Sequence, residues 1–251
     1  MKSDRIEFKG ALGETLSAKL DHADGDMKAC ALFAHCFTCS KNLKAVGHIT
    51  KALSMHGIST LRFDFTGLGN SEGDFSNTNF SSNVEDLVAA AVYMEKNLEA
   101  PSILVGHSLG GAAVIHAAHQ INTVKAVATI GAPADPVHVK ENFSLKVDEI
   151  EQTGEATVTL AGRPFKIKKQ FLDDLKSANM EDKIKNLNKA LLIMHAPLDK
   201  TVGIDNAARL YAKAKHPKSY ISLHEADHLL TEQVYSRYAG GLIAQWSDVY
   251  V

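Results

Sequence analysis

The sequence predicts an α/β fold in which a mostly parallel central sheet is flanked by helices and carries a small inserted cap. Short apolar runs alternate along the chain with segments of helical spacing, which is typical of parallel strands joined by helical crossovers. The run ACALFA at residues 29–34 is apolar throughout, as expected of a central strand. The alternation fails between residues 136 and 188, and the cap is expected there.

The remaining elements follow in a regular order. Two short strands at residues 6–9 and 16–20 are expected to pair as an opening hairpin around Gly10 and Gly13. Further strands are expected at residues 29–34, 59–65, 102–105, 124–130, 189–194 and 219–223. Four helices are expected. One covers residues 43–56, one follows a capping box formed by Ser82 and Glu85, one covers residues 109–119, and the last begins at about Thr231.

Residues 136–188 form an insertion within one domain that spans residues 1–251. A small hairpin is expected at residues 156–160 and 164–168, with its turn at residues 161–163, and a helix is expected at 170–179. An insertion after the carboxyl end of a strand is where an active-site cap would sit. The alternative to a cap is a surface segment with no role at the active site.

Composition narrows the class of protein. The chain has 251 residues and a formal net charge of −2, which leaves no basic footprint for nucleic acid or anionic lipid. No stretch is apolar enough for a signal peptide or a membrane span, so we expect a soluble, cytoplasmic protein with no nucleic-acid or membrane partner. Its three cysteines suggest no disulfide framework, and we expect reduced thiols. The oligomeric state is open.

The motif G-x-S-x-G occurs as Gly106-His107-Ser108-Leu109-Gly110. It follows an apolar strand and precedes a helix of small residues, which is the setting that a strained nucleophile turn requires. The serine side chain then projects from the sheet edge, and the glycines let neighbouring backbone approach closely. Ser108 is therefore the candidate nucleophile.

A serine hydroxyl needs a base and an orienting acid, and this architecture supplies the acid and then the histidine after the serine in the chain. Asp199 follows the strand at residues 189–194, and His228 follows the last strand, so they are the candidate acid and base. The rivals are Asp135, after the preceding strand, and His224. Asp227 adjoins His228 in sequence and is a poor orienting acid. The other histidines are expected to be solvated or packed.

The stretch AHCFTCS at residues 34–40 occupies the loop that should complete an oxyanion hole. Such a hole needs two backbone N–H donors, one from the residue after the nucleophile, here Leu109, and one from this loop. Phe37 is the expected second donor.

The cysteines of this loop allow other interpretations. Cys36 and Cys39 have the C-x-x-C spacing of a redox pair, and His35 beside them could belong to a metal site. The helix that follows begins close enough to keep the redox interpretation open. A metal site needs more ligands than the loop supplies, and a haem attachment motif would have a histidine where Ser40 stands.

The chain resembles α/β-hydrolases over nearly its whole length, and in particular the hydrolase part of bacterial bifunctional α/β-hydrolase/OsmC-type fusion proteins. The resemblance rests on stretches such as LFAHCFTCSKN, VGHSLGGAAV, ATIGAPADP, APLDKTVGIDNA and KHPKSYISLHEADHLL. It implies a triad of Ser108, Asp199 and His228 with oxyanion donors at Phe37 and Leu109. No OsmC-type domain is expected after Val251, and whether such a partner acts with the chain is open.

A more distant resemblance to cinnamoyl and feruloyl esterases, which share a comparable loop and a small cap, implies short or aromatic acyl esters. We therefore expect a serine hydrolase, a carboxylesterase acting on a small-molecule ester through an acyl-enzyme, with no metal and no other cofactor. Hydrolysis of thioesters, amides or C–C bonds would use the same triad. A non-catalytic binding module, or a thiol redox protein using Cys36 and Cys39, are the alternatives of another class.

Overall fold

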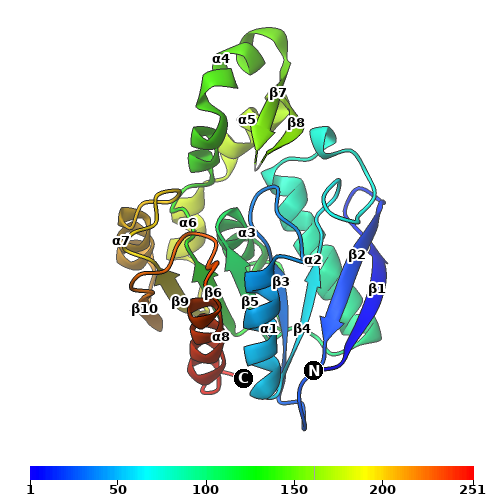
Figure 1. Cartoon of the computed structure of the whole chain (residues 1–251), viewed down its shortest axis with the longest axis vertical. Helices are drawn as coiled ribbons and strands as arrows, with labels where there is room; N and C mark the ends of the chain where they lie inside the picture. Colours follow the sequence, from blue (N-terminus) through cyan, green and yellow to red (C-terminus); the bar gives the residue numbers. More distant parts are fainter. Residues whose placement is uncertain (161) are drawn as a thin grey trace.

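The computed structural model describes residues 1–160 and 162–251 (Figure 1). Its centre is an eight-stranded sheet in the order β1-β2-β4-β3-β5-β6-β9-β10. Only the pairs β1–β2 and β2–β4 are antiparallel, so the sheet is mostly parallel, as predicted. The strands are β1 (Ser3–Lys9), β2 (Thr15–Asp21), β3 (Ala29–Ala34), β4 (Ile58–Phe63), β5 (Ile103–His107), β6 (Ala126–Ile130), β9 (Ala190–His195) and β10 (Lys218–Ser222).

Helices cover both faces of this sheet (Figure 1). Helices α1 (Lys44–Met55) and α8 (Gln233–Ser247) pack together on one face. Helices α2 (Phe80–Asn97), α3 (Leu109–Ala117) and α7 (Asp205–Lys213) bury their apolar residues in the cluster on the other face. Strand β3 is apolar throughout because both of its faces are buried. Cys30, Leu32 and Ala34 join the cluster on one face of the sheet, and the alternate residues join the cluster on the other.

The insertion predicted after β6 forms its own elements, most of which are drawn at the top of Figure 1. They are the 3-10 segment η2 (Pro136–Phe143), α4 (Ser144–Thr153), β7 (Glu155–Leu160), β8 (Arg163–Lys168), α5 (Lys169–Ser177) and α6 (Met180–Lys185). Strands β7 and β8 pair antiparallel as the expected hairpin. Within its expected turn, Ala161 lies outside the described residues. Val158, Ile167 and Phe171 bury into the same apolar cluster as α2 and α3, which anchors the insertion to the domain.

Two local predictions need correction. The capping box of α2 joins Asn79 and Ser82 rather than Ser82 and Glu85: the Asn79 side chain accepts from the Ser82 N–H, and the Ser82 hydroxyl bonds the Asn79 backbone. The helix therefore starts at Phe80. Helices α4, α6 and α7 are additional to the sequence prediction, since short helices with only one to three buried residues give a weak periodic signal.

Across the described part of the chain, every helix is too short or too polar to cross a lipid bilayer.

Candidate active site

Ser108 lies at a sharp turn between β5 and α3. Its backbone has φ 55° and ψ −126°, a left-handed conformation that is rare for a residue with a side chain. The glycines around it are required by close backbone packing. A Cβ atom at Gly106 would lie 2.3 Å from the carbonyl oxygen of Gly110, and one at Gly110 would lie 2.5 Å from those of Ala34 and His35. The backbone of the turn therefore packs closely against its own helix and against the end of β3.

The structure brings Ser108, His228 and Asp199 together from three loops at the carboxyl edge of the sheet. His228 Nε2 lies 3.0 Å from Ser108 Oγ, and His228 Nδ1 lies 2.7 Å from Asp199 Oδ2. The other carboxylate oxygen of Asp199 accepts from the N–H groups of Thr201 and Val202 at 2.8 and 2.9 Å. A carboxylate at Nδ1 selects the tautomer with its proton there, which leaves Nε2 able to accept the serine proton.

The rival residues lie elsewhere. Asp135 is exposed and accepts from the N–H of Val137, so it caps η2. Asp227 accepts from the backbone and hydroxyl of Thr231. His224 is exposed. None of the three is bonded to Ser108 or His228 among the described residues.

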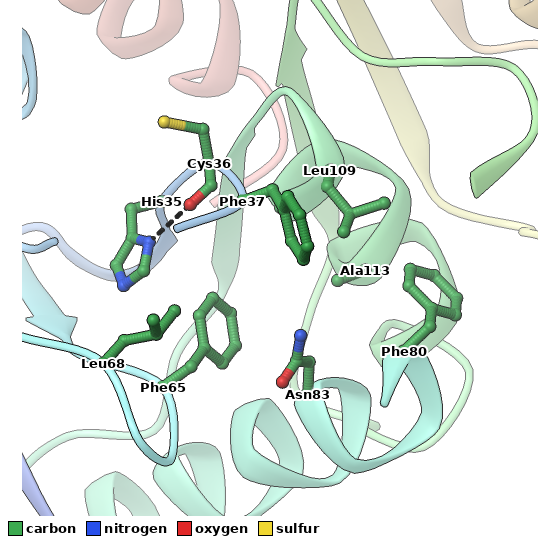
Figure 2. Close-up of a pocket in the computed structure, with 10 residues that line it drawn as sticks. His35, Cys36, Phe37, Phe65, Leu68, Phe80, Asn83, Leu109 and Ala113 are labelled. Atoms are coloured by element: carbon green, nitrogen blue, oxygen red, sulfur yellow. Dashed lines mark hydrogen bonds between the residues drawn. The ribbon is translucent and has the colours of Figure 1, made fainter. Parts of the chain in front are cut away.

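The loop after β3 lies beside the Ser108 turn. Cys36, Phe37, Thr38 and Cys39 line one groove together with Ser108 and His228. The backbone N–H groups of Phe37 and Leu109 donate to no acceptor among the described residues, which leaves both available to a bound oxyanion. Behind the loop, the Phe37 and Leu109 side chains line an apolar cavity of about 10 Å³ (Figure 2), which is at the lower limit for a single water.

Cys36 and Cys39 form a disulfide, with their Cα atoms 5.3 Å apart. The expectation of reduced thiols is therefore wrong for this pair. The composition argument concerned frameworks that link distant parts of a chain, whereas this bridge joins neighbours in a single turn. The third cysteine, Cys30, is free and buried in β3, and burial raises the pKa of its thiol to about 11.

Comparison with known proteins places this chain in a family. A family model described as serine aminopeptidase, S33, matches residues 25–148. The crystal structure of an esterase domain from a Rhodothermus marinus protein is 47% identical, covers 100% of this chain and 99% of that one, and superposes with a TM-score of 0.81. The chain belongs to the α/β-hydrolase superfamily.

Other members of the superfamily are more distant. A mitochondrial palmitoyl-protein thioesterase, ABHD10 of Mus musculus, is 35% identical over 118 residues. That match covers 45% of this chain and 37% of the mouse protein, so the chain matches about a third of the length of this curated relative. Est1E of Butyrivibrio proteoclasticus, solved with ferulic acid, is 20% identical over 96% of this chain and 98% of that one, with a TM-score of 0.77, and shares the fold.

The candidate acid is ionised at neutral pH. Burial raises the pKa of the Asp199 carboxyl, but hydrogen bonds from His228 and from the Val202 and Thr201 N–H groups outweigh burial and leave the pKa below its ordinary value. The Asp199 side chain is 1% exposed and that of His228 is 10% exposed, so water screens their contact only weakly.

Three further histidines adjoin the site, which the sequence analysis had left as solvated or packed. Each stands at the end of a parallel strand and donates a ring N–H to the carbonyl of a loop. His35 Nδ1 bonds Cys36 O at 2.8 Å, His107 Nε2 bonds His228 O at 2.7 Å, and His195 Nε2 bonds Val202 O at 2.8 Å. Burial lowers the pKa of all three, to about 3 for His107, so they are neutral donors. Their signal in the sequence was a histidine ending each apolar strand.

Above the triad lies a groove of about 340 Å³. Its walls come from the loop after β3, from the triad loops and from the insertion, which contributes Asn142, Thr159 and Leu160. Apart from His228, the lining residues described carry no ionisable side chain other than the disulfide-bonded cysteines. The Arg163 guanidinium of β8 also reaches down to donate to the carbonyl of Thr38. No group of three or more His, Cys, Asp or Glu side chains in residues 1–160 and 162–251 is arranged to hold a metal ion.

Proposed function

We propose that this protein is a serine hydrolase, a carboxylesterase that cleaves small acyl or aromatic esters through an acyl-enzyme. The observation that carries the proposal is the continuous hydrogen-bonded chain from Ser108 Oγ through His228 to the Asp199 carboxylate, opening into the groove. A weak nucleophile becomes reactive when a neutral imidazole accepts its proton in the transition state.

In the proposed mechanism Ser108 attacks the ester carbonyl while His228 takes the hydroxyl proton. Asp199 holds the imidazole in the required tautomer and stabilises the imidazolium. The negative charge on the tetrahedral oxygen is met by the N–H groups of Phe37 and Leu109. His228 then gives its proton to the leaving alcohol. A water molecule, activated by the same histidine, releases the acid and restores the serine.

The groove favours an uncharged substrate of modest size. A volume of about 340 Å³ lies at the small end of ligand sites in proteins. None of the lining residues described carries a permanent charge that could pair with a carboxylate or ammonium group on the substrate, so burying such a group against them is unfavourable. We propose that the insertion at residues 136–188 acts as the cap that sets this limit, because three of its side chains line the groove. The relationship to Est1E, solved with ferulic acid, supports trying aromatic esters. We retain the cytoplasm as the proposed compartment.

A thioester is the second candidate substrate. The similarity to a palmitoyl-protein thioesterase favours it, and a triad of this kind acts on either acyl bond. The groove volume argues for a short acyl chain rather than a long one.

The test is turnover of p-nitrophenyl esters of increasing chain length, of methyl ferulate and of a short acyl thioester, by the wild type and by Ser108→Ala. We expect short and aromatic esters to be cleaved and the activity to vanish in the variant. His224→Gln serves as a matched control for His228→Gln: the first should keep the activity and the second should lose it. Turnover that survives in Ser108→Ala would refute the proposal.

A further inference from the structure

The disulfide encloses the peptide unit that is proposed to supply the second oxyanion donor. Cys36 and Cys39 are bridged, and between them lie Phe37 and Thr38. The Cys39 N–H also donates to the Cys36 carbonyl at 3.1 Å, which closes a tight turn. Thr38 has φ 61°, a conformation that a threonine adopts only when its surroundings impose it. The bridge therefore holds the loop in a conformation that it would not favour by itself.

This turn fixes the direction of the Phe37 N–H. In a trans peptide the N–H and C=O of one unit point in opposite directions, so a fixed carbonyl of Cys36 fixes the N–H of Phe37. That carbonyl accepts from Cys39 N–H within the turn and from His35 Nδ1 behind it (Figure 2). Two restraints hold the turn that makes the Cys39 contact: the disulfide, and the bond from Arg163 to the Thr38 carbonyl. Opening the bridge removes the covalent one and loosens one of the two groups that orient the donor.

The bridge is also reachable from the groove. Cys36 is 4% exposed and Cys39 is half-buried, and both line the groove that Ser108 and His228 enter. A compound small enough to occupy this space would lie against Cys39, the more exposed of the two bridged residues. Cys30, in contrast, is buried in a β-strand away from the groove.

We propose that the Cys36–Cys39 disulfide is a thiol–disulfide exchange site for small thiols, and that its redox state sets the rate of the hydrolase by fixing or freeing the Phe37 oxyanion donor. This inference rests on the proposed serine hydrolase function. The thiolate of a small thiol attacks Cys39 Sγ, the S–S bond breaks, and Cys36 leaves as a thiolate that is then protonated. A second thiol displaces Cys39 from the mixed disulfide. The protein gains two thiols, and two small thiols are oxidised to one disulfide.

The experiment compares the two redox states of the whole chain. Protein purified without reductant is divided, one part is reduced with dithiothreitol, and the reductant is removed under argon before ester turnover is measured. Intact mass, and alkylation with iodoacetamide, count the thiols in each part. We expect reduction to add two hydrogens and to lower kcat by at least about tenfold, toward the roughly 10²–10³-fold loss that follows removal of an oxyanion donor. Reoxidation with oxidised glutathione should restore the rate, and KM should change less than kcat.

Two variants separate the bridge from other effects. Cys36→Ser/Cys39→Ser should turn over at the rate of the reduced wild type and be insensitive to dithiothreitol. Cys30→Ser removes the third cysteine and keeps the bridge, so it should respond to reduction as the wild type does. Thermal unfolding of each form, compared with the reduced wild type, shows whether a low rate reflects a misfolded variant.

The outcomes distinguish a failure of the redox control from a failure of the proposed esterase activity. A mass without the disulfide, or a reduced enzyme with unchanged kcat, overturns the redox control and leaves the esterase standing. Absence of turnover in both redox states overturns the esterase and the control together, while the thiol count still decides whether the site exchanges with small thiols.

Discussion

Replacing His107 tests whether a buried neutral histidine ties the nucleophile turn to the loop of the base. Its Nε2–H donates to the carbonyl of His228 at 2.7 Å, and its ring centroid lies 5.0 Å from that of His228. Burial, reinforced by the charge that His228 would carry, lowers the pKa of His107 to about 3; the charge of Asp199 acts in the opposite direction. His107→Gln keeps an N–H donor at the corresponding position and removes the titration, whereas His107→Leu removes both.

The size of the effect follows from linkage. The pKa of His107 is lowered in the folded state, so the unfolded chain binds the proton more tightly, and acid favours unfolding. The stability that His107 contributes is complete above the unfolded pKa of about 6.5 and is lost as pH falls towards about 3. At about pH 5 the unfolded histidine is almost fully protonated and the folded one is not, which corresponds to a loss of about 2 kcal/mol relative to about pH 8.

Urea unfolding followed by the fluorescence of Trp246, the one tryptophan of the chain, measures this loss. Other buried histidines contribute as well, so the informative quantity is a double difference. The fall in unfolding free energy between about pH 8 and about pH 5 should be about 2 kcal/mol smaller in His107→Gln than in the wild type. At about pH 8, His107→Gln should keep kcat within a few-fold, and His107→Leu should lose up to about tenfold for one missing hydrogen bond. Equal pH dependence in wild type and His107→Gln would refute the reasoning.

Three further predictions concern the supports of the site. Asp199→Asn should lower kcat by about 10⁴-fold because the amide no longer selects the tautomer, while Asp135→Asn stays near wild type; equal losses would contradict the assignment. The Lys41 ammonium pairs with the buried Asp64 carboxylate, so Lys41→Met leaves that carboxylate without its cation and should lower the unfolding free energy by about 3–5 kcal/mol. A loss below about 1 kcal/mol would show that other groups compensate for the missing ammonium. Gly110→Ala places a Cβ 2.5 Å from two carbonyl oxygens and should destabilise by about 1–3 kcal/mol in urea, whereas unchanged stability would mean that the end of β3 can yield.

The fold was predictable because its signals are local. Strand β3 shows an apolar run. A strand, a glycine–serine motif and a helix follow one another directly between Ile103 and Ala117. Each of these elements lies where the sequence indicated. The start of α2 was mistaken because both Asn79 and Ser82 can cap, and only the backbone shows which side chain reaches the free N–H groups. Short helices such as α6 escaped because six residues hold too few buried positions to establish a period.

The sequence favoured Asp199 as the candidate acid but left Asp135 as a rival, since both follow parallel strands. Packing around Gly131 explains why Asp199, and not Asp135, lies beside His228. Its φ of +55° turns the chain away at the end of β6, and a Cβ there would lie 3.2 Å from Asp199 Oδ2 and 3.4 Å from His228 Nδ1. The loop after β6 therefore leaves room for a carboxylate from β9, while Asp135 turns outward to cap η2. A contact of this kind joins three loops and appears only when the strands are in register.

The strand-end histidines follow a common physical logic. A loop that must hold a reacting group rigidly needs its carbonyls bonded, yet a charged donor beside the triad would perturb the charge that develops on His228. A buried imidazole solves both requirements, because it donates one N–H and stays neutral once desolvated. His35, His107 and His195 do this for the loops of the oxyanion donor, the base and the acid respectively. The Nε2 of His35 and the Nδ1 of His195 have no hydrogen-bond partner among the described residues. Burial also outweighs the attraction that Asp64 and Asp199 would exert on the protonated rings, so the pKa of each stays lowered. Their neutrality is therefore a property of the packing, and the same packing sets the geometry of the proposed triad.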